Sequence, residues 1–168
     1  MPRSGLRYAA AVLRVLVLCH GNICRSPIAE VLLEAAIAGD PDLVGRVRVT
    51  SAGTSAEHEG EGMHPESAAL LARRGLRTSH RARRLSPAVA AQQDLIVAAD
   101  RWNLRDGRAL VAAATSHAEV RLLRDFDPEA VGRDLDDPWG QPPRAYEQTA
   151  AAVEAAIPGI LGALRARL

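Results

Sequence analysis

The chain has 168 residues, of which 48% are apolar and 24% are charged, so its composition is that of one folded globular domain and not of a disordered segment. Its 21 basic residues are balanced by 20 acidic ones, which argues against a general nucleic-acid binder, because such proteins carry a surplus of positive charge. All the basic residues are arginine. Schiff-base chemistry on lysine, lysine-anchored PLP and Walker-type phosphate loops are therefore excluded.

Neither end of the chain predicts a targeting or membrane segment. The apolar stretch near the N-terminus is interrupted by Arg14 and has no small-residue cleavage pattern, unlike a signal peptide. The apolar stretch near the C-terminus is interrupted by Glu154 and Pro158, unlike a membrane span. We expect a cytoplasmic, monomeric protein with one domain over residues 1–168, of which residues 1–13 are an N-terminal extension.

Short apolar or alternating runs predict the strands of a sheet. In chain order these runs are Arg14–Cys19, Arg46–Ser51, Asp94–Ala99 and Glu119–Leu123. Segments with helical spacing lie between and after them. Strands that alternate with helices predict an α/β fold, a doubly wound parallel sheet with helices on both faces.

The first helix is predicted to begin with Ser26 as its N-cap and Pro27 at its first position, and to end at Gly39. Further helices are expected at Pro65–Arg74, Arg101–Ala113 and Arg144–Arg167. Pro158 should kink or divide the last of these, because proline lacks the N–H that a helix needs. Residues 52–64 and 124–143 are expected to be loops.

The loop after the first strand, Cys19–Pro27 (CHGNICRSP), carries the strongest sign of chemistry. In open parallel sheets ligands bind beyond the carboxyl ends of the strands, where this loop lies. Gly21 and Asn22 readily take left-handed backbone angles, so the loop can turn its N–H groups toward one point at a helix N-terminus. Arg25 adds a planar guanidinium that matches two phosphate oxygens. These features predict an anion site.

Cys19 lies at the floor of this predicted site. A lone cysteine at a strand end is usually a small buried apolar residue. Here the anion-binding features favour its thiolate, and a thiolate that faces a tetrahedral oxyanion is a nucleophile aimed at phosphorus. A zinc site made by Cys19, His20 and Cys24 with His58, His64 or His80 is disfavoured, because the sequence has no second cysteine pair. We expect no metal and no cofactor.

Other polar and aromatic residues are given simpler interpretations. Three histidines have no evident partner and are expected at the surface: His58, His64 and His117. Three aromatic residues are expected to pack in the core: Trp102, Phe126 and Tyr146. The six arginines between Arg73 and Arg84 are interpreted as solvated surface, with a basic rim for acidic phosphopeptides as the alternative.

The segment Val17–Glu30 (VLCHGNICRSPIAE) resembles the signature of the low-molecular-weight protein tyrosine phosphatases. The resemblance continues, in the order of that family, through Val49–Thr54 (VTSAGT), Arg74–Arg83 (RGLRTSHRAR), Asp94–Asn103 (DLIVAADRWN), Leu122–Pro128 (LLRDFDP) and Asp136–Gly140 (DDPWG). It covers most of the chain. It implies a four-stranded parallel sheet, in agreement with the strands predicted above.

The resemblance also implies roles for individual residues. Cys19 corresponds to the nucleophile, Arg25 to the phosphate-binding arginine and Asp137 to the general acid and base. The phosphate would be bound by the loop formed by His20, Gly21, Asn22, Ile23, Cys24, Arg25 and Ser26. A hydrogen-bond network that supports the loop would consist of Asn22, Ser26, Ser51 and His80. From chemistry alone Asp136 competes with Asp137, but only Asp137 has the family's step from Asp to Pro.

Cys24 is either a buried helix-start residue or, as the resemblance implies, a resolving thiol that forms a disulfide with an oxidised Cys19. Two rim positions depart from the family. Glu57 stands where an aromatic wall is common, and Trp139 is followed by Gly140 where the family has an aromatic pair. These departures affect which phosphorylated substrate the pocket prefers more than they affect the phosphatase reaction itself.

The expected function is hydrolysis of phosphotyrosine in proteins, with phosphorylated proteins and phosphate or other oxyanions as partners, and with no nucleic-acid or membrane partner. Two alternatives stay open. Phosphatases for another phosphoresidue, such as phosphoarginine, resemble this family but tend to carry Thr where this chain has Ile23. An arsenate reductase on the same scaffold would need cysteines beyond Cys24, and the sequence has none.

Overall fold

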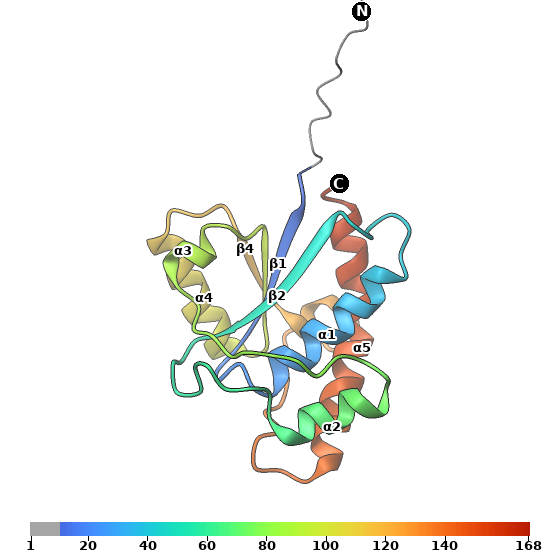
Figure 1. The fold of residues 1–168 in the computed structure, drawn as a ribbon. Helices are drawn as coiled ribbons and strands as arrows, with labels where there is room; N and C mark the ends of the chain where they lie inside the picture. The colour runs from blue at the N-terminus through green and yellow to red at the C-terminus, as the bar shows by residue number, and fades with distance from the viewer. Residues whose placement is uncertain (1–10) are drawn as a thin grey trace, which may run out of the picture.

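The computed structural model describes residues 11–168 and contains a parallel sheet of four strands in the order β2-β1-β3-β4 (Figure 1). The strands are β1 (Leu13–Cys19), β2 (Val47–Gly53), β3 (Leu95–Ala98) and β4 (Glu119–Leu122). The predicted α/β fold class is confirmed. Of the expected N-terminal extension, residues 1–10 lie outside the described part of the chain, and Leu13 already begins β1.

The burial of each strand follows from its sequence. The last five residues of β1 and all four residues of β3 are buried, because these two central strands are apolar on both faces. The edge strands β2 and β4 carry exposed charged residues, Arg48 and Glu119. The register pairs Cys19 with Gly53, so β1 and β2 end together at the carboxyl edge of the sheet.

Helices cover both faces of the sheet (Figure 1). On one face lie α1 (Arg25–Ala38), α2 (Pro65–Arg73) and α5 (Pro143–Arg165), whose buried side chains share a core with Val15 and Val17 of β1. On the other face lie α3 (Pro87–Ala90) and α4 (Arg101–Ala113), which pack with Leu16 and Leu18. None of the helices in residues 11–168 is long and apolar enough to cross a membrane.

Two helix predictions differ in detail from the structure. Of the two outcomes expected at Pro158, a kink or a division, the division does not occur, because helix α5 continues through Pro158 and the turn that follows is packed in the core by the buried Ile160 and Leu164. Helix α1 begins at Arg25, with Cys24 at its N-cap position, so Ser26 lies inside the first turn and is not the cap. Its hydroxyl is used elsewhere, as described below.

Two short helices lie in segments expected to be loops or left unassigned. Residues 87–90 form α3, which Ser86 caps by accepting from Val89 N–H, and Leu123–Phe126 forms the 3-10 helix η1. Phe126 is buried as expected, whereas Trp102 is 61% exposed and not in the core. Trp102 lies on the solvent side of α4, where the Arg105 guanidinium stacks 4.8 Å from its ring centroid.

Candidate active site

The predicted anion loop connects the end of β1 to the start of α1 at the carboxyl edge of the sheet. Asn22 alone in this loop takes a left-handed conformation, with φ 58°, as its side chain permits. Gly21 was expected to do the same and does not. A Cβ at Gly21 would lie 3.0 Å from Cδ2 of His58, so a larger residue there would require that imidazole ring to shift. Beneath the loop, a Cβ on Gly53 would lie 2.6 Å from the His20 carbonyl oxygen.

The side chain of Asn22 is fully buried and organises the loop. Its Nδ2 donates to Ser26 Oγ at 2.8 Å and to Ser51 Oγ at 2.9 Å, and its Oδ1 accepts from the Arg83 N–H at 3.0 Å. The ring of His80 donates through Nε2 to the Asn22 carbonyl oxygen at 2.6 Å. The structure thus brings together the four residues of the expected supporting network, and adds Arg83 to them.

Cys19 has two hydrogen-bonding neighbours at its sulfur, a backbone N–H and a hydroxyl. Its Sγ lies 2.9 Å from Ser26 Oγ and accepts from the Asn22 N–H at 3.3 Å. The residue is only 3% exposed, at the floor of the loop. Ser26 therefore serves Cys19 with the hydroxyl that was expected to cap the helix.

Arg25 is fixed by two partners that sequence reasoning missed. Its Nη1 donates to Asp100 Oδ2 at 2.9 Å and to the Leu135 carbonyl oxygen at 2.8 Å, and the residue is only 4% exposed. Burial lowers the pKa of Arg25, but the charges of Cys19, Asp137 and Asp100 outweigh that effect and raise it overall. The guanidinium is permanently charged. The position of Asp100, just beyond β3 at the same edge of the sheet, was the available signal.

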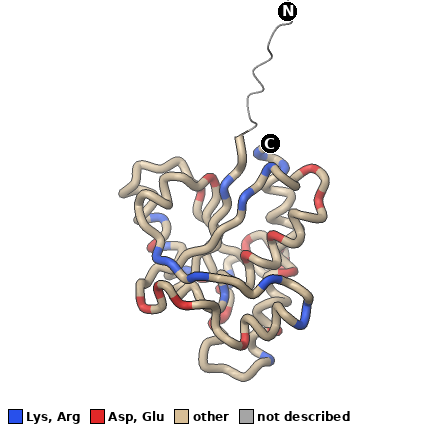
Figure 2. The backbone as a smooth tube through the Cα atoms, viewed as in Figure 1, with Lys and Arg blue, Asp and Glu red and all other residues tan. Residues whose placement is uncertain are grey.

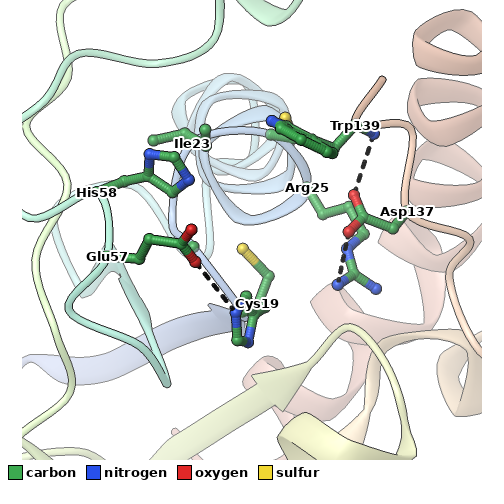
Figure 3. A pocket seen from close by; sticks show the side chains of 10 residues that line it. Cys19, Ile23, Arg25, Glu57, His58, Asp137 and Trp139 are labelled. Atoms are coloured by element: carbon green, nitrogen blue, oxygen red, sulfur yellow. Dashed lines mark hydrogen bonds and ion pairs between the residues drawn. The ribbon is translucent and has the colours of Figure 1, made fainter. Parts of the chain in front are cut away.

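Asp137 approaches the loop from the segment before α5. Its Oδ2 lies 3.8 Å from Arg25 Nη2, its Oδ1 accepts from the Trp139 N–H at 3.2 Å, and its side chain is 53% exposed. It lines a cavity of about 240 Å³ together with Cys19 and Arg25. Asp136 does not line this cavity. Of the two neighbouring carboxylates, Asp137 is therefore the one that lines the same cavity as the thiol, where it faces Arg25 (Figure 3).

The mouth of the cavity has two unlike sides (Figure 3). Trp139 stands on the side of Asp137, and Glu57 and His58 stand on the other, with Cys19 between them. Glu57 lies 3.8 Å from His20 Nε2, and His58 Nδ1 lies 3.0 Å from a Glu61 carboxylate oxygen. His58 was expected to be a surface residue without a partner. It is instead a wall of the cavity.

Cys24 also lines the cavity but faces a buried polar group behind the loop. Its Sγ lies 3.7 Å from Tyr146 Oη, and that hydroxyl lies 3.2 Å from His64 Nδ1. Burial raises the pKa of Cys24 to about 11 and also raises that of Tyr146. Tyr146 is in the core as expected. His117 is exposed as expected, and its Nε2 lies 3.1 Å from Asp94 Oδ1, a partner that the sequence did not reveal, whereas His64 is half-buried.

Comparisons with known proteins agree with this arrangement. Residues 14–168 match the family of low molecular weight phosphotyrosine protein phosphatases. The chain is 42% identical over 154 residues to a low molecular weight protein-tyrosine-phosphatase of Streptomyces coelicolor, which covers 90% of this chain and 93% of that protein. It is 39% identical over 150 residues to low molecular weight protein-tyrosine phosphatase A of Mycobacterium tuberculosis, at 88% and 89% coverage.

Among solved structures, the Drosophila arginine phosphatase superposes with a TM-score of 0.82 and 25% identity, over 90% of this chain and 98% of that one. The fold, the cysteine loop and the named relatives together define an enzyme of the phosphatase class. The chain belongs to the low molecular weight phosphotyrosine protein phosphatase family.

Proposed function

We propose that the protein hydrolyses phosphotyrosine in phosphorylated proteins, with Cys19 as the nucleophile. The observation that carries this proposal is the position of Cys19 Sγ, which contacts Ser26 Oγ and accepts from the Asn22 N–H at the floor of a cavity that Arg25 and Asp137 also line. The loop N–H groups and the Arg25 guanidinium bind the phosphate dianion. Because Asp100 and Leu135 hold Arg25 in place, this charge needs no rearrangement as the transition state forms.

The reaction has two steps. The Cys19 thiolate attacks phosphorus while the bond to the tyrosine oxygen breaks, and the Asp137 carboxylic acid protonates that oxygen as it leaves, since a phenol has a pKa of about 10. The products of this step are cysteinyl phosphate on Cys19 and the dephosphorylated tyrosine side chain of the substrate protein. In the second step the Asp137 carboxylate takes a proton from water, the water oxygen attacks phosphorus, and inorganic phosphate leaves the regenerated thiolate.

The cavity walls bear on the substrate. Trp139 and the ring of His58 stand on opposite sides of the mouth, where a phenyl ring can lie between them (Figure 3). Phosphoarginine is the second candidate, because the Drosophila relative is an arginine phosphatase and the Glu57 carboxylate suits a guanidinium. Ile23 opposes it, since an apolar side chain in the cavity disfavours a branched, charged group beside the phosphate.

The test compares kcat/KM for a phosphotyrosine peptide and a phosphoarginine peptide, together with arsenate reduction. We expect phosphotyrosine to be preferred and arsenate not to be reduced. Cys19→Ser should lose hydrolysis but still bind vanadate, because the loop N–H groups remain. Glu57→Gln should depress phosphoarginine hydrolysis selectively, with Glu59→Gln, an exposed neighbour outside the cavity, as the matched control. Appreciable turnover by Cys19→Ser, or a preference for phosphoarginine in the parent, would contradict the proposal.

We further propose that Cys24 protects the nucleophile from irreversible oxidation. Peroxide converts the Cys19 thiolate to a sulfenic acid and is itself reduced to hydroxide. The Cys24 sulfur then displaces the sulfenic oxygen as water and forms a Cys19–Cys24 disulfide, which a thiol reductant reduces. The support for this role is that both cysteines are free thiols that line one cavity.

Because the pKa of Cys24 is raised to about 11, disulfide formation should become faster as pH rises from neutrality toward that value. After mild peroxide treatment, the parent should recover activity on addition of thiol, and Cys24→Ser should recover less. Equal recovery of the two proteins after the same dose would assign Cys24 a purely structural role. A catalytic thiolate must stay reduced, so we place this activity in a reducing compartment, the cytoplasm. We also propose that the protein acts as a monomer.

A further inference from the structure

A second pocket lies on the sheet face that carries α3, away from the cysteine loop. It has a volume of about 210 Å³, and its lining includes the arginines Arg14, Arg48 and Arg83 together with Thr50 and Gln93. Arg14 and Arg48 are the second residues of β1 and β2, and Arg83 comes from the segment between α2 and α3, where Figure 2 shows basic positions along the chain. No acidic residue lines the pocket.

The three arginines are close together and lack carboxylate partners. Arg14 and Arg48 are Cα partners in neighbouring strands, so their side chains leave the same face of the sheet side by side. Within residues 11–168 none of the three guanidinium groups pairs with a carboxylate, and residues 1–10 contain no Asp or Glu. The adjacent Asp94 is engaged by the Arg14 backbone N–H and by His117. Neighbouring like charges repel, and an anion between them would turn that repulsion into attraction.

Two polar atoms at the same pocket have no partner. Thr50 Oγ1 and Gln93 Oε1 are buried and make no hydrogen bond within the described part of the chain. The Gln93 side chain is held in place, because the residue is 96% buried and its Nε2 donates to the Val89 carbonyl oxygen. Buried polar groups normally have partners. The threonine hydroxyl can donate and the glutamine oxygen can accept, so a hydrogen phosphate group, which offers both functions, would satisfy both atoms once their side chains turn into the pocket.

We propose that this pocket is a second anion site, which binds a phosphate group carried either by inorganic phosphate or by a phosphorylated molecule. Arginine forks bind phosphate oxygens in pairs, which suits three guanidiniums around one small cavity. Arg83 also links this site to the cysteine loop. Its Nε donates to the Ser51 carbonyl oxygen at 3.0 Å, and its backbone N–H donates to Asn22. Binding of phosphate at this site does not depend on the catalytic reaction at Cys19.

The test titrates inorganic phosphate into the ¹⁵N-labelled full chain, with sodium chloride at matched ionic strength as the reference. Two sets of amide signals should shift with separate binding curves: the loop amides of Gly21, Asn22 and Cys24, and the pocket amides of Thr50, Gln92 and Gln93. A second titration with O-phosphoserine distinguishes a site for any phosphate group from one that admits only the free ion. Binding of either ligand at the pocket amides supports the proposal.

Arg48→Gln should weaken binding at the pocket amides by about tenfold and leave the loop amides within about twofold of the parent, because one charge-assisted contact is lost from one site only. Thr50→Val should also weaken the pocket site. Arg46→Gln is the matched control, since Arg46 is exposed nearby but does not line the pocket. The proposal is overturned if the pocket amides do not shift with either ligand, if chloride shifts them equally, or if Arg46→Gln has the effect of Arg48→Gln.

Discussion

Arg25 illustrates how a single residue is prepared for its task. A buried guanidinium without partners would be costly, and here Asp100 and the Leu135 carbonyl oxygen hold one of its nitrogens. The other terminal nitrogen lies near Asp137. The charge is therefore fixed in position and in protonation state before substrate arrives, which is what electrostatic stabilisation of a transition state requires.

The neighbouring carboxylates Asp136 and Asp137 should differ in their kinetic importance. A general acid matters most when the leaving group is poor, so Asp137→Asn should slow hydrolysis of phenyl phosphate by about 10²–10⁴-fold, and that of p-nitrophenyl phosphate much less. Asp136→Asn should change both rates little, since Asp136 does not line the cavity with Cys19. The measurement is kcat/KM across aryl phosphates of different leaving-group acidity. A steeper dependence for Asp136→Asn than for Asp137→Asn would exchange their roles.

At the scale of elements, the packing of α5 against η1 depends on one glycine. A Cβ on Gly159 would overlap the backbone carbonyl group of Phe126, so the two elements approach each other as closely as their backbones allow. This contact immediately follows Pro158, which leaves a carbonyl group of the preceding turn without its helical partner. The close approach and the buried turn that follows together fix the path of α5 beyond the proline.

Gly159→Ala should therefore destabilise the protein although alanine favours helices. The added methyl group must displace backbone atoms, and we expect a loss of about 1–3 kcal/mol in the free energy of unfolding, as for other overpacked sites. Gly162→Ala, in the same helix with no atom near its Cβ position, should instead raise stability by about 0.5–1 kcal/mol. Urea unfolding of both variants gives the comparison. If Gly159→Ala were more stable than the parent, the backbone of η1 would have to move away from α5 at little cost in free energy, contrary to this prediction.

The sequence predicted those features that depend on neighbours along the chain. The four strands, the loop from Cys19 to Arg25 and the turn residue Asn22 carry local signals of burial, spacing and backbone preference. The sequence did not predict features that depend on contacts between residues far apart in the chain. Asp100 was not assigned to Arg25, because the two are distant in sequence. The continuity of α5 at Pro158 depends on core packing, which outweighs the local preference of proline.

At the scale of the whole molecule, two buried acidic groups link stability to pH. Burial raises the pKa of Cys24 from 9.0 to about 11, and that of Tyr146 is raised above 10.0 as well. Each group keeps its proton more tightly in the folded protein than in the unfolded chain. The stability that follows from this difference is complete below about pH 9 and is lost as pH rises through the folded pKa values.

The free energy of unfolding should therefore fall as pH rises above about 9. The shift of Cys24 alone corresponds to a loss of about 1 kcal/mol by pH 10 and about 2 kcal/mol by pH 11. Cys24→Ala should reduce this pH dependence, whereas Val31→Ala, which truncates a buried side chain within α1, should lower stability equally at all pH values and leave the pH dependence unchanged. Urea titrations between about pH 8 and pH 10 test this. An unchanged slope in Cys24→Ala would exclude the thiol as its source.

The position of β1 has a consequence for how the enzyme loses activity. This strand is hydrogen-bonded to neighbours on both sides, and its last residue is Cys19. Backbone amides in such a central strand exchange their hydrogens with solvent slowly, because exchange requires the sheet to separate. The reactive thiol is thus attached to the end of the central strand, where Cys19 pairs with Gly53 of the edge strand β2. We expect the thiol to keep its place when β4 frays, whereas separation of β2 would remove the strand partner of Cys19.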